Sequence, residues 1–324
     1  MNKIRSILSP LSSFLPIAPL VNLSKQKLFL PYYHSVQGAY DLVHIKHLYQ
    51  PKTKIEFERD LDFLLQNFTP ISFFDLKNHL LNQNPFEKPC FHLSFDDGLS
   101  EIYDIVLPIL EKKGIPATFF LNTDFIDNRD LFYRYKVSLI IEKIKGKVKN
   151  QKEIQKLLNF RFKDISTIDE IAQKYQIDFN DFLKTQQPYL TTPQIEKIIQ
   201  KGYTIGAHSL NHPHYEDLKL EDQILQTTES LNLLQKRFAL DYGIFSFPFT
   251  DFGVTEHFFD EIFANDSVDF TFSSAGLKKD KLQRHLHRTQ MEDHGKSGKD
   301  IIKTEYLYYL LKSFLGKNTA KRDC

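Results

Sequence analysis

The sequence predicts an α/β protein built around a parallel β-sheet, and three observations support this fold class. The chain has 324 residues, of which 41% are hydrophobic and 26% charged, enough for two average domains or one large α/β barrel. Strand and helix patterns alternate between residues 91 and 122, and such a unit joins parallel strands. The segments richest in reactive side chains follow predicted strands, where α/β barrels and open α/β sheets place their sites.

The first part of the chain alternates between apolar strands and amphipathic helices. Apolar residues recur at helical spacing from Ile55 to Phe68, and Pro70 stops that helix. Gly114 and Pro116 end the next helix in the same way. The expected elements are a strand over 28–33, a helix over 55–68, a strand over 91–95, a helix over 102–110 and a strand over 117–122.

A Lys-rich, helix-periodic segment from about 129 to 189 interrupts this alternation and predicts a helical insertion. Insertions after barrel strands project onto the active face, so we expect its helices over or beside the strand carboxyl ends, shaping a substrate cleft. The alternative is a peripheral helical pair that only stabilises the fold. The later expected elements are a helix with Thr192 as N-cap, a strand over 203–207, a helix over 218–238, a strand over 243–249 and a docking helix around 306–311.

Residues 1–27 are expected to form a leader ahead of the main domain. The apolar stretch from Ile7 to Val21 is interrupted by three prolines and is not followed by a small-x-small cleavage site. We therefore expect a loosely packed or surface-docking leader rather than a cleaved signal peptide. No apolar run reaches the ~18 residues of a spanning helix. The expected location is cytoplasmic, with possible peripheral membrane association, and the expected boundaries are a main domain over 28–315 and a tail over 316–324.

Charge and cysteine content narrow the class of function. Lys and Arg total 42 against 41 Asp and Glu, so no basic excess favours nucleic acid as a partner, and a neutral or small substrate fits better. Cys90 and Cys324 form neither a metal-type pair nor a disulfide framework. Any metal must therefore bind to His and carboxylate side chains. The chain has no Trp, so any sugar stacking must use Tyr or Phe.

The first reactive motif is Ser94-Phe95-Asp96-Asp97-Gly98, directly after a predicted strand. Two adjacent carboxylates at a strand end point in different directions, so one can bind a metal while the other accepts a proton from water. Gly98 permits the turn that aims them. The alternative is a polar turn in which an Asp caps the following helix.

The second reactive motif runs from His208 to His214. His208 and His212 are four apart and can share a metal if they lie on one helical turn, while His214 adds a third imidazole. The alternative is a surface histidine cluster without ligands. Taken with the first motif, the two segments supply two His and one Asp with a position left open for water, which is typical of a catalytic metal site.

Together these motifs resemble the NodB-type polysaccharide deacetylases, carbohydrate esterase family 4. SFDDG at 94–98, HSLNH at 208–212 and FSFPF at 245–249 occur in the family's order, and YYHSV at 32–36 is similar to the opening strand of the branch acting on exopolysaccharide. The resemblance spans roughly 28–315. It implies an irregular (β/α)7-type barrel enlarged by the helical insertion. It also implies hydrolysis of an N-acetyl group on an amino sugar, in a surface polysaccharide or its lipid-linked precursor.

The resemblance also implies roles for individual residues. It makes Asp96 the catalytic base and Asp97, His208 and His212 the ligands of a divalent metal, usually Zn²⁺. The backbone N–H of Phe249 would help to hold the oxyanion. A histidine should protonate the leaving amine, and we favour His287 slightly over His285, the alternative being a surface histidine without a role. His34 is a further candidate, and its alternative is a packed, hydrogen-bonded histidine.

Two positions depart from the family pattern. The third motif often carries an Arg that orients the catalytic Asp, but Ser246 stands there and no Arg lies between Phe238 and Phe249. Phe270 stands where the fourth motif often has Trp. One alternative function keeps the metal chemistry but changes the acyl group, as in a deformylase or O-deacetylase on a related glycan. The missing Arg and the uncertain acid motivate a second alternative, an inactive glycan-binding member of the same fold.

Overall fold

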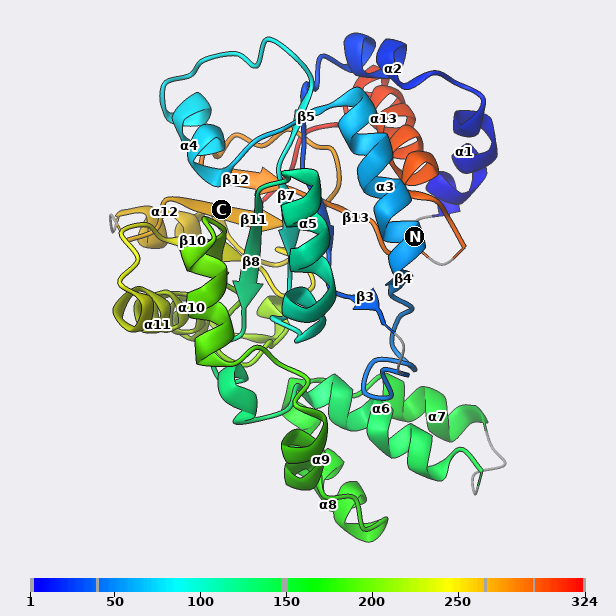
Figure 1. Cartoon of the computed structure of the whole chain (residues 1–324), viewed down its shortest axis with the longest axis vertical. Coiled ribbons are helices and arrows are strands. Elements are labelled where there is room, and N and C mark those ends of the chain that lie inside the picture. The colour runs from blue at the N-terminus through cyan, green and yellow to red at the C-terminus, as the bar shows by residue number, and fades with distance from the viewer. Residues whose placement is uncertain (1–2, 39–40, 147–150, 265–266, 294, 323–324) are drawn as a thin grey trace.

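The computed structural model describes residues 3–38, 41–146, 151–264, 267–293 and 295–322 (Figure 1). Its strands are β1 Leu28–Phe29, β2 Pro31–Tyr33, β3 Val36–Gln37, β4 Lys52–Thr53, β5 Thr69–Pro70, β6 Cys90–Phe91, β7 Leu93–Phe95, β8 Ala117–Leu121, β9 Thr204–Ala207, β10 Ile244–Ser246, β11 Phe270–Ser273, β12 His285–His287 and β13 Thr289–Gln290. Its α-helices are α1 Lys3–Ser13, α2 Ile17–Ser24, α3 Lys54–Asn67, α4 Phe73–Leu81, α5 Leu107–Lys113, α6 Tyr133–Ile144, α7 Gln151–Leu158, α8 Ile165–Lys174, α9 Phe179–Gln186, α10 Thr192–Gln200, α11 Leu220–Phe238, α12 Glu256–Ala264 and α13 Gly298–Phe314.

The main sheet is parallel throughout and nearly closes into a barrel. Its strand order is β12-β11-β10-β9-β8-β7-β2-β13. The two ends of this order, β12 and β13, are separated only by Arg288, so one stretch of chain pairs with β11 on one side and with β2 on the other. This confirms the expected irregular (β/α)7-type barrel, with β12 and β13 counted as one interrupted strand.

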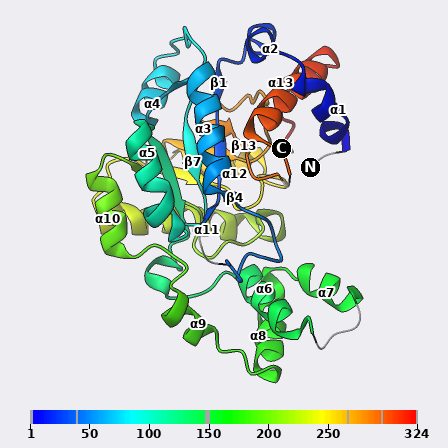
Figure 2. The same cartoon turned by 45° about the vertical axis from the view of Figure 1, so that its right-hand side comes forward.

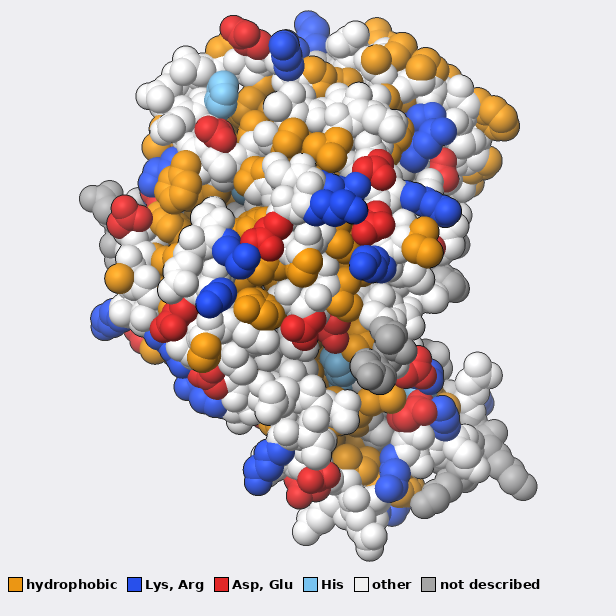
Figure 3. Space-filling view, in the orientation of Figure 1, with side chains coloured by type: hydrophobic (Ala, Val, Ile, Leu, Met, Phe, Trp, Pro, Cys, Tyr) orange, Lys and Arg blue, Asp and Glu red, His pale blue; other side chains and the backbone are white. Residues whose placement is uncertain are grey.

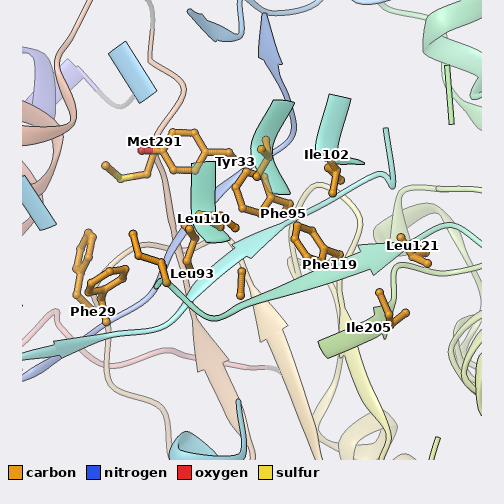
Figure 4. Close-up of a cluster of buried hydrophobic side chains, with 14 of the residues drawn as sticks. Phe29, Tyr33, Leu93, Phe95, Ile102, Leu110, Phe119, Leu121, Ile205 and Met291 are labelled. Atoms are coloured by element: carbon orange, nitrogen blue, oxygen red, sulfur yellow. The ribbon is translucent and has the colours of Figure 1, made fainter. Parts of the chain in front are cut away.

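Side chains alternate between the inside and the outside of the barrel along each strand. On β8, Phe119 packs outward in the main core cluster, while Phe120 belongs to a separate cluster with Phe272. Figure 4 shows the outward cluster, where Phe95 and Phe119 stack with ring centroids 5.4 Å apart. Each such fully buried Phe stabilises the fold by roughly 1.5–3 kcal/mol. The same alternation leaves Ser94 and Asp96 on the inner side.

Local capping explains where several helices begin and end. Thr53 and Glu56 form a reciprocal capping box at the start of α3, and Gly114 ends α5 with a left-handed φ of 63°. The expected N-cap of α10 is wrong by one residue. Thr191 takes that place, because its backbone N–H donates to the Gln194 side chain.

Helices α6 to α9 lie within residues 133–146 and 151–186 and share a second hydrophobic cluster, which also includes Ile45, Leu99 and Phe125. Figures 1 and 2 show them together at one end of the barrel. The hydroxyl of Tyr135, on α6, donates to Asp97 Oδ2 at 2.9 Å. Asp97 follows β7, so the insertion lies at the strand carboxyl ends, as expected for a segment that shapes the cleft.

Residues 3–24 pack more closely than the expected leader. The Ser12 and Thr304 hydroxyls lie 2.8 Å apart, and Arg5 pairs with the buried Glu305 of α13. Pro16 is the N-cap of α2, where its missing N–H breaks no helical bond. Pro16 therefore separates two short helices, while Pro10 lies inside α1 and Pro19 lies in the first turn of α2. Across the described ranges, no helix is long and apolar enough to span a bilayer.

Candidate active site

A cavity of about 260 Å³ lies at the carboxyl ends of the barrel strands. Its wall contains all four residues expected at a metal site with an adjacent base: Asp96, Asp97, His208 and His212. These four side chains are almost completely buried, with at most 5% of each residue exposed. The structure therefore brings together two motifs that are more than 100 positions apart in the sequence.

Asp97, His208 and His212 are arranged as a metal ligand set. Asp97 Oδ1 lies 3.5 Å from His208 Nε2 and 3.3 Å from His212 Nε2. Asp97 Oδ1 is buried and has no hydrogen-bond partner among the described residues. An orphaned carboxylate oxygen facing two imidazole nitrogens is the donor set that a divalent cation satisfies. The residues present thus fit the expected metal.

Neighbouring groups orient these ligands. His208 Nδ1–H donates to the Ser246 carbonyl oxygen at 2.8 Å, which points Nε2 into the cavity. Burial lowers the pKa of His208 to about 4, so the imidazole is neutral at neutral pH and its lone pair can bind a metal. Tyr135 fixes the other oxygen of Asp97, Oδ2.

Several site residues adopt the left-handed backbone region that side chains disfavour. The φ angles are 71° at Asp97, 62° at His212 and 57° at Phe249. Gly98 follows with a φ of 67°, and a Cβ there would lie 2.9 Å from Leu121 Cδ2, which explains why glycine follows the two carboxylates. Backbone strain gathered at one cavity is typical of a functional site held in place by the surrounding fold.

Arg288 holds Asp96, and the sequence analysis did not find this residue. Its Nη1 and Nη2 donate to Asp96 Oδ1 and Oδ2, each at 2.7 Å. Burial raises the pKa of Asp96, but the Arg288 guanidinium outweighs it and leaves the pKa below its usual value. Asp96 is therefore an aimed, ionised carboxylate at neutral pH.

Arg288 supplies the arginine that the third motif lacks. Nη2 of Arg288 also donates to Ser246 Oγ, the side chain at the position where that motif often has Arg. The guanidinium lies over the Tyr32 ring at 4.4 Å. Arg288 follows directly on β12, and its inward direction depends on the register of the strand that closes the barrel, which no local sequence pattern gives.

His34 lines the same cavity and pairs with a buried carboxylate. Its Nδ1 contacts Glu292 Oε2, while Oε1 of Glu292 accepts the backbone N–H groups of His34 at 3.0 Å and Ser35 at 3.1 Å. Burial would lower the pKa of His34, but the Glu292 carboxylate outweighs it and raises the pKa to about 9. His34 is thus protonated at neutral pH beside Asp96 and Asp97.

The structure does not bring His285 or His287 into this cavity. His287 Nδ1 lies 2.5 Å from Ser273 Oγ, and its Nε2 lies 3.0 Å from Asp280 Oδ2. Because side chains alternate along the last strand, Arg288 points inward and the two histidines point outward. The expectation that His287 acts as the general acid therefore needs correction on geometric grounds.

Phe249 lies in the cavity wall, where its ring contacts two histidines. Its centroid is 4.5 Å from that of His212 and 3.7 Å from that of His214. His214 thus packs against Phe249 and is not part of the triad. The guanidinium of Arg134, on α6 of the insertion, lies over the Phe249 ring, 5.7 Å from its centroid.

Comparisons with known proteins agree with this geometry. The family described as polysaccharide deacetylase matches residues 83–257. No curated protein sequence matches the chain. The Streptococcus pyogenes deacetylase PplD, in complex with acetate, superposes with a TM-score of 0.56 at 15% identity, covering 86% of this chain and 97% of that one.

Two further solved structures share the fold. IcaB from Ammonifex degensii gives a TM-score of 0.54 at 16% identity, over 86% of this chain and 97% of that one. A de-N-acetylase from Aggregatibacter actinomycetemcomitans gives 0.53 at 14% identity, over 85% and 99%. Because the family match covers more than half of the sequence, the chain belongs to the polysaccharide deacetylase family, hydrolases that act on the carbon–nitrogen bond of N-acetyl groups.

Proposed function

We propose that the protein is a metal-dependent deacetylase that removes the N-acetyl group of an amino sugar in a surface polysaccharide or its lipid-linked precursor. One observation carries this proposal: a single cavity is lined by Asp97, His208 and His212, by Asp96 and by His34. Arg288 donates to Asp96, and Glu292 pairs with His34. These groups supply the metal ligands, the base and the acid that amide hydrolysis needs.

Asp97, His208 and His212 would hold the divalent metal, expected to be Zn²⁺, with positions left open toward the cavity. When bound, such an ion polarises the acetyl carbonyl and makes water at the site more acidic. Asp96 takes the proton from the attacking water. The two hydrogen bonds from Arg288 hold both Asp96 oxygens in one orientation and keep the carboxylate ionised and ready to accept.

His34 is the group we assign as the general acid. The leaving amine of an amide must be protonated before the carbon–nitrogen bond breaks. His34 lines the cavity wall, carries a proton at neutral pH and is oriented by Glu292 through Nδ1. Its Nε2–H then donates the proton. The pairing resembles other imidazole–carboxylate pairs, in which the carboxylate stabilises the protonated ring.

The remaining cavity wall suits a sugar. We assign the Phe249 backbone N–H as the donor to the oxyanion, which is the acetyl oxygen after water has attacked the acetyl carbon. The left-handed backbone of Phe249 supports this role for its N–H. Tyr49, Phe132 and the Phe249 ring line the cavity and provide the apolar faces on which a sugar ring can stack in a chain without Trp.

The Tyr135→Phe variant tests the role of the insertion. Removing the hydroxyl that fixes Asp97 Oδ2 should weaken metal affinity about 10- to 100-fold, the usual effect of losing a group that orients a ligand. Tyr133→Phe is the matched control, because the Tyr133 hydroxyl has no hydrogen-bond partner among the described residues. Metal affinity is measured by competition with a chromophoric chelator. Equal affinities of the two variants would contradict the role of Tyr135.

A substrate screen tests the reaction. The chain is stripped with a chelator, reloaded with Zn²⁺ and incubated with N-acetylated monosaccharides, oligosaccharides and lipid-linked sugars. We expect metal-dependent acetate release from at least one N-acetylated glycan, with a free amine in the product by mass spectrometry. Formate release or loss of acetyl only from oxygen would contradict the N-deacetylase assignment, and glycan binding without turnover would indicate an inactive member.

We further propose that α1 and α2 rest on an anionic membrane surface, which suits a lipid-linked substrate. Leu8 and Ser12 face α13, whereas Ile7, Leu11 and Phe14 form an outward stripe with 68%, 60% and 89% exposure. Figure 3 shows hydrophobic side chains gathered over α1 and α2. Residues 1–27 contain four Lys or Arg and no Asp or Glu. An apolar stripe in a basic segment fits anionic lipid headgroups.

The Leu11→Glu variant tests this contact. It places a negative charge in the apolar stripe and should weaken binding to phosphatidylglycerol-containing vesicles at least about tenfold. Leu225→Glu is the matched control, because Leu225 is an exposed leucine on α11 with 52% exposure. Co-sedimentation with vesicles measures both. Equal binding of the two variants, or no preference for anionic over neutral vesicles, would contradict the proposal.

A further inference from the structure

A second cluster of metal-ligand side chains lies on the outer wall of the barrel. Asp251, His285 and His287 each offer one ligand atom, all within 4.8 Å of one another. A fourth donor is Asp280, whose Oδ2 lies 3.0 Å from His287 Nε2. Asp251 follows β10, Asp280 lies between β11 and β12, and both histidines are on β12. None of the four lines the catalytic cavity.

The imidazoles in this cluster are oriented as metal ligands are. His285 Nδ1 lies 2.7 Å from Thr271 Oγ1, and His287 Nδ1 lies 2.5 Å from Ser273 Oγ. Each Nε2 therefore points at a carboxylate. A hydroxyl can donate or accept. Each imidazole can thus carry its proton on Nδ1 and donate it to the hydroxyl. In this tautomer the Nε2 lone pair is free to bind a metal, and the hydrogen bond to the hydroxyl is kept.

A side-chain cation already occupies the centre of the cluster. Arg322 Nη2 lies 2.8 Å from Asp251 Oδ2 and 2.7 Å from Asp280 Oδ2, and only 4% of its side chain is exposed. One guanidinium between two buried carboxylates leaves a net negative charge when the imidazoles are neutral. A divalent cation would neutralise both carboxylates, which burial strongly favours.

Arg322 is also an imperfect occupant. Its Nε is buried without a hydrogen-bond partner in the described part of the chain. It belongs to a short terminal segment held to residue 279 by two backbone bonds, Lys279 N–H to Asn318 and Ala320 N–H to Lys279. A cavity of about 170 Å³ reaches Asp251, His287 and Arg322 from outside, so an ion has an access route.

We propose that Asp251, Asp280, His285 and His287 form a second binding site for a transition-metal dication, and that Arg322 is the cation that competes with the metal for it. Two imidazoles and two carboxylates suit Zn²⁺ or Co²⁺. The segments that carry this site also border the catalytic cavity. Asp251 is two residues after Phe249, and Ser273 adjoins Ser274, whose Oγ donates to the Phe249 carbonyl.

Co²⁺ binding to the full chain tests this site independently of catalysis. The background variant His208→Gln/His212→Gln removes two ligands of the catalytic triad. In this background we expect one Co²⁺ per chain, with the visible bands of four-coordinate cobalt. Adding His285→Gln/His287→Gln should abolish that equivalent, and circular dichroism checks that each variant is folded.

The Arg322→Met variant is expected to strengthen Co²⁺ binding rather than weaken it, and an unfolded protein would not produce this result. Removing the competing cation should tighten Co²⁺ binding about tenfold in the same background. If no Co²⁺ binds to the background variant either with or without the Arg322→Met change, the cluster is an ion-pair network and the proposal is wrong. If Co²⁺ binds equally tightly to both, Arg322 does not compete and that part of the proposal is overturned.

Discussion

Replacing Asp96 by Asn should lower kcat for acetate release by about 10³-fold, within the range that general base catalysis contributes. Asn keeps the shape of the side chain but cannot take a proton from water. It also leaves the buried Arg288 guanidinium without its carboxylate partner. Initial rates on the best substrate of the screen measure the effect, with thermal unfolding as the check on folding.

The neighbouring Asp97→Asn variant is the matched comparison. Asp97 Oδ1 faces both imidazoles of the triad, so this variant should lose both metal and activity, whereas Asp96→Asn should lose activity but keep the metal. Metal content by atomic emission separates the two. An Asp96→Asn protein that turns over at the wild-type rate, or that has lost its metal, would contradict the assignment of Asp96 as base.

The second large effect is expected at His34. The His34→Gln variant should lower kcat on an N-acetyl substrate by about 10²- to 10³-fold, because the leaving amine then lacks its proton donor. Hydrolysis of an activated aryl acetate should fall much less, since a phenolate leaves without prior protonation. His287→Gln, which changes a histidine outside the cavity, should leave both rates within a few-fold of wild type. The reverse pattern would restore His287 as the acid.

The pH profile gives His34 a signature that a merely structural role would not produce. The pKa of His34 is about 9 in the presence of Glu292, so the required protonated form is present below pH 9 and is lost as pH rises through that value. Glu292→Gln removes the charge that raises the pKa and should move the alkaline limb of kcat/KM down by about 1–3 pH units. Glu101→Gln, which removes a carboxylate bonded to Ser35 rather than to His34, should leave the limb in place.

Most of the fold could be predicted because its signals are local. Apolar periodicity, Pro70 and Gly114 identify α3 and α5 from a few neighbouring residues. The two helices within residues 3–24 were not predicted, because the effect of each proline depends on where it falls in a helix. The packing of α1 on α13 joins residues about 300 positions apart, and no local pattern predicts it.

The site divides in the same way. Asp96, Asp97, His208 and His212 could be brought together from sequence because parallel strands end at one edge of the sheet. Arg288 could not, since its direction depends on a one-residue register in the strand that closes the barrel. Glu292 is also far from its partner in the sequence, 258 positions from His34. The partners that tune the base and the acid are therefore non-local, whereas the metal ligands stand in compact motifs.

Metal reconstitution of acetate release tests the central claim most directly. The chelator-treated chain is titrated with Zn²⁺ while acetate release from an N-acetylated glycan and bound metal are measured together, with His208→Gln/His212→Gln as the reference. We predict no acetate release without metal. Acetate release by the wild-type chain should rise as it binds one equivalent of Zn²⁺, and the reference variant should not bind this equivalent. Full acetate release by the chelated chain, or by the variant without the two histidines, would contradict a catalytic metal held by Asp97, His208 and His212.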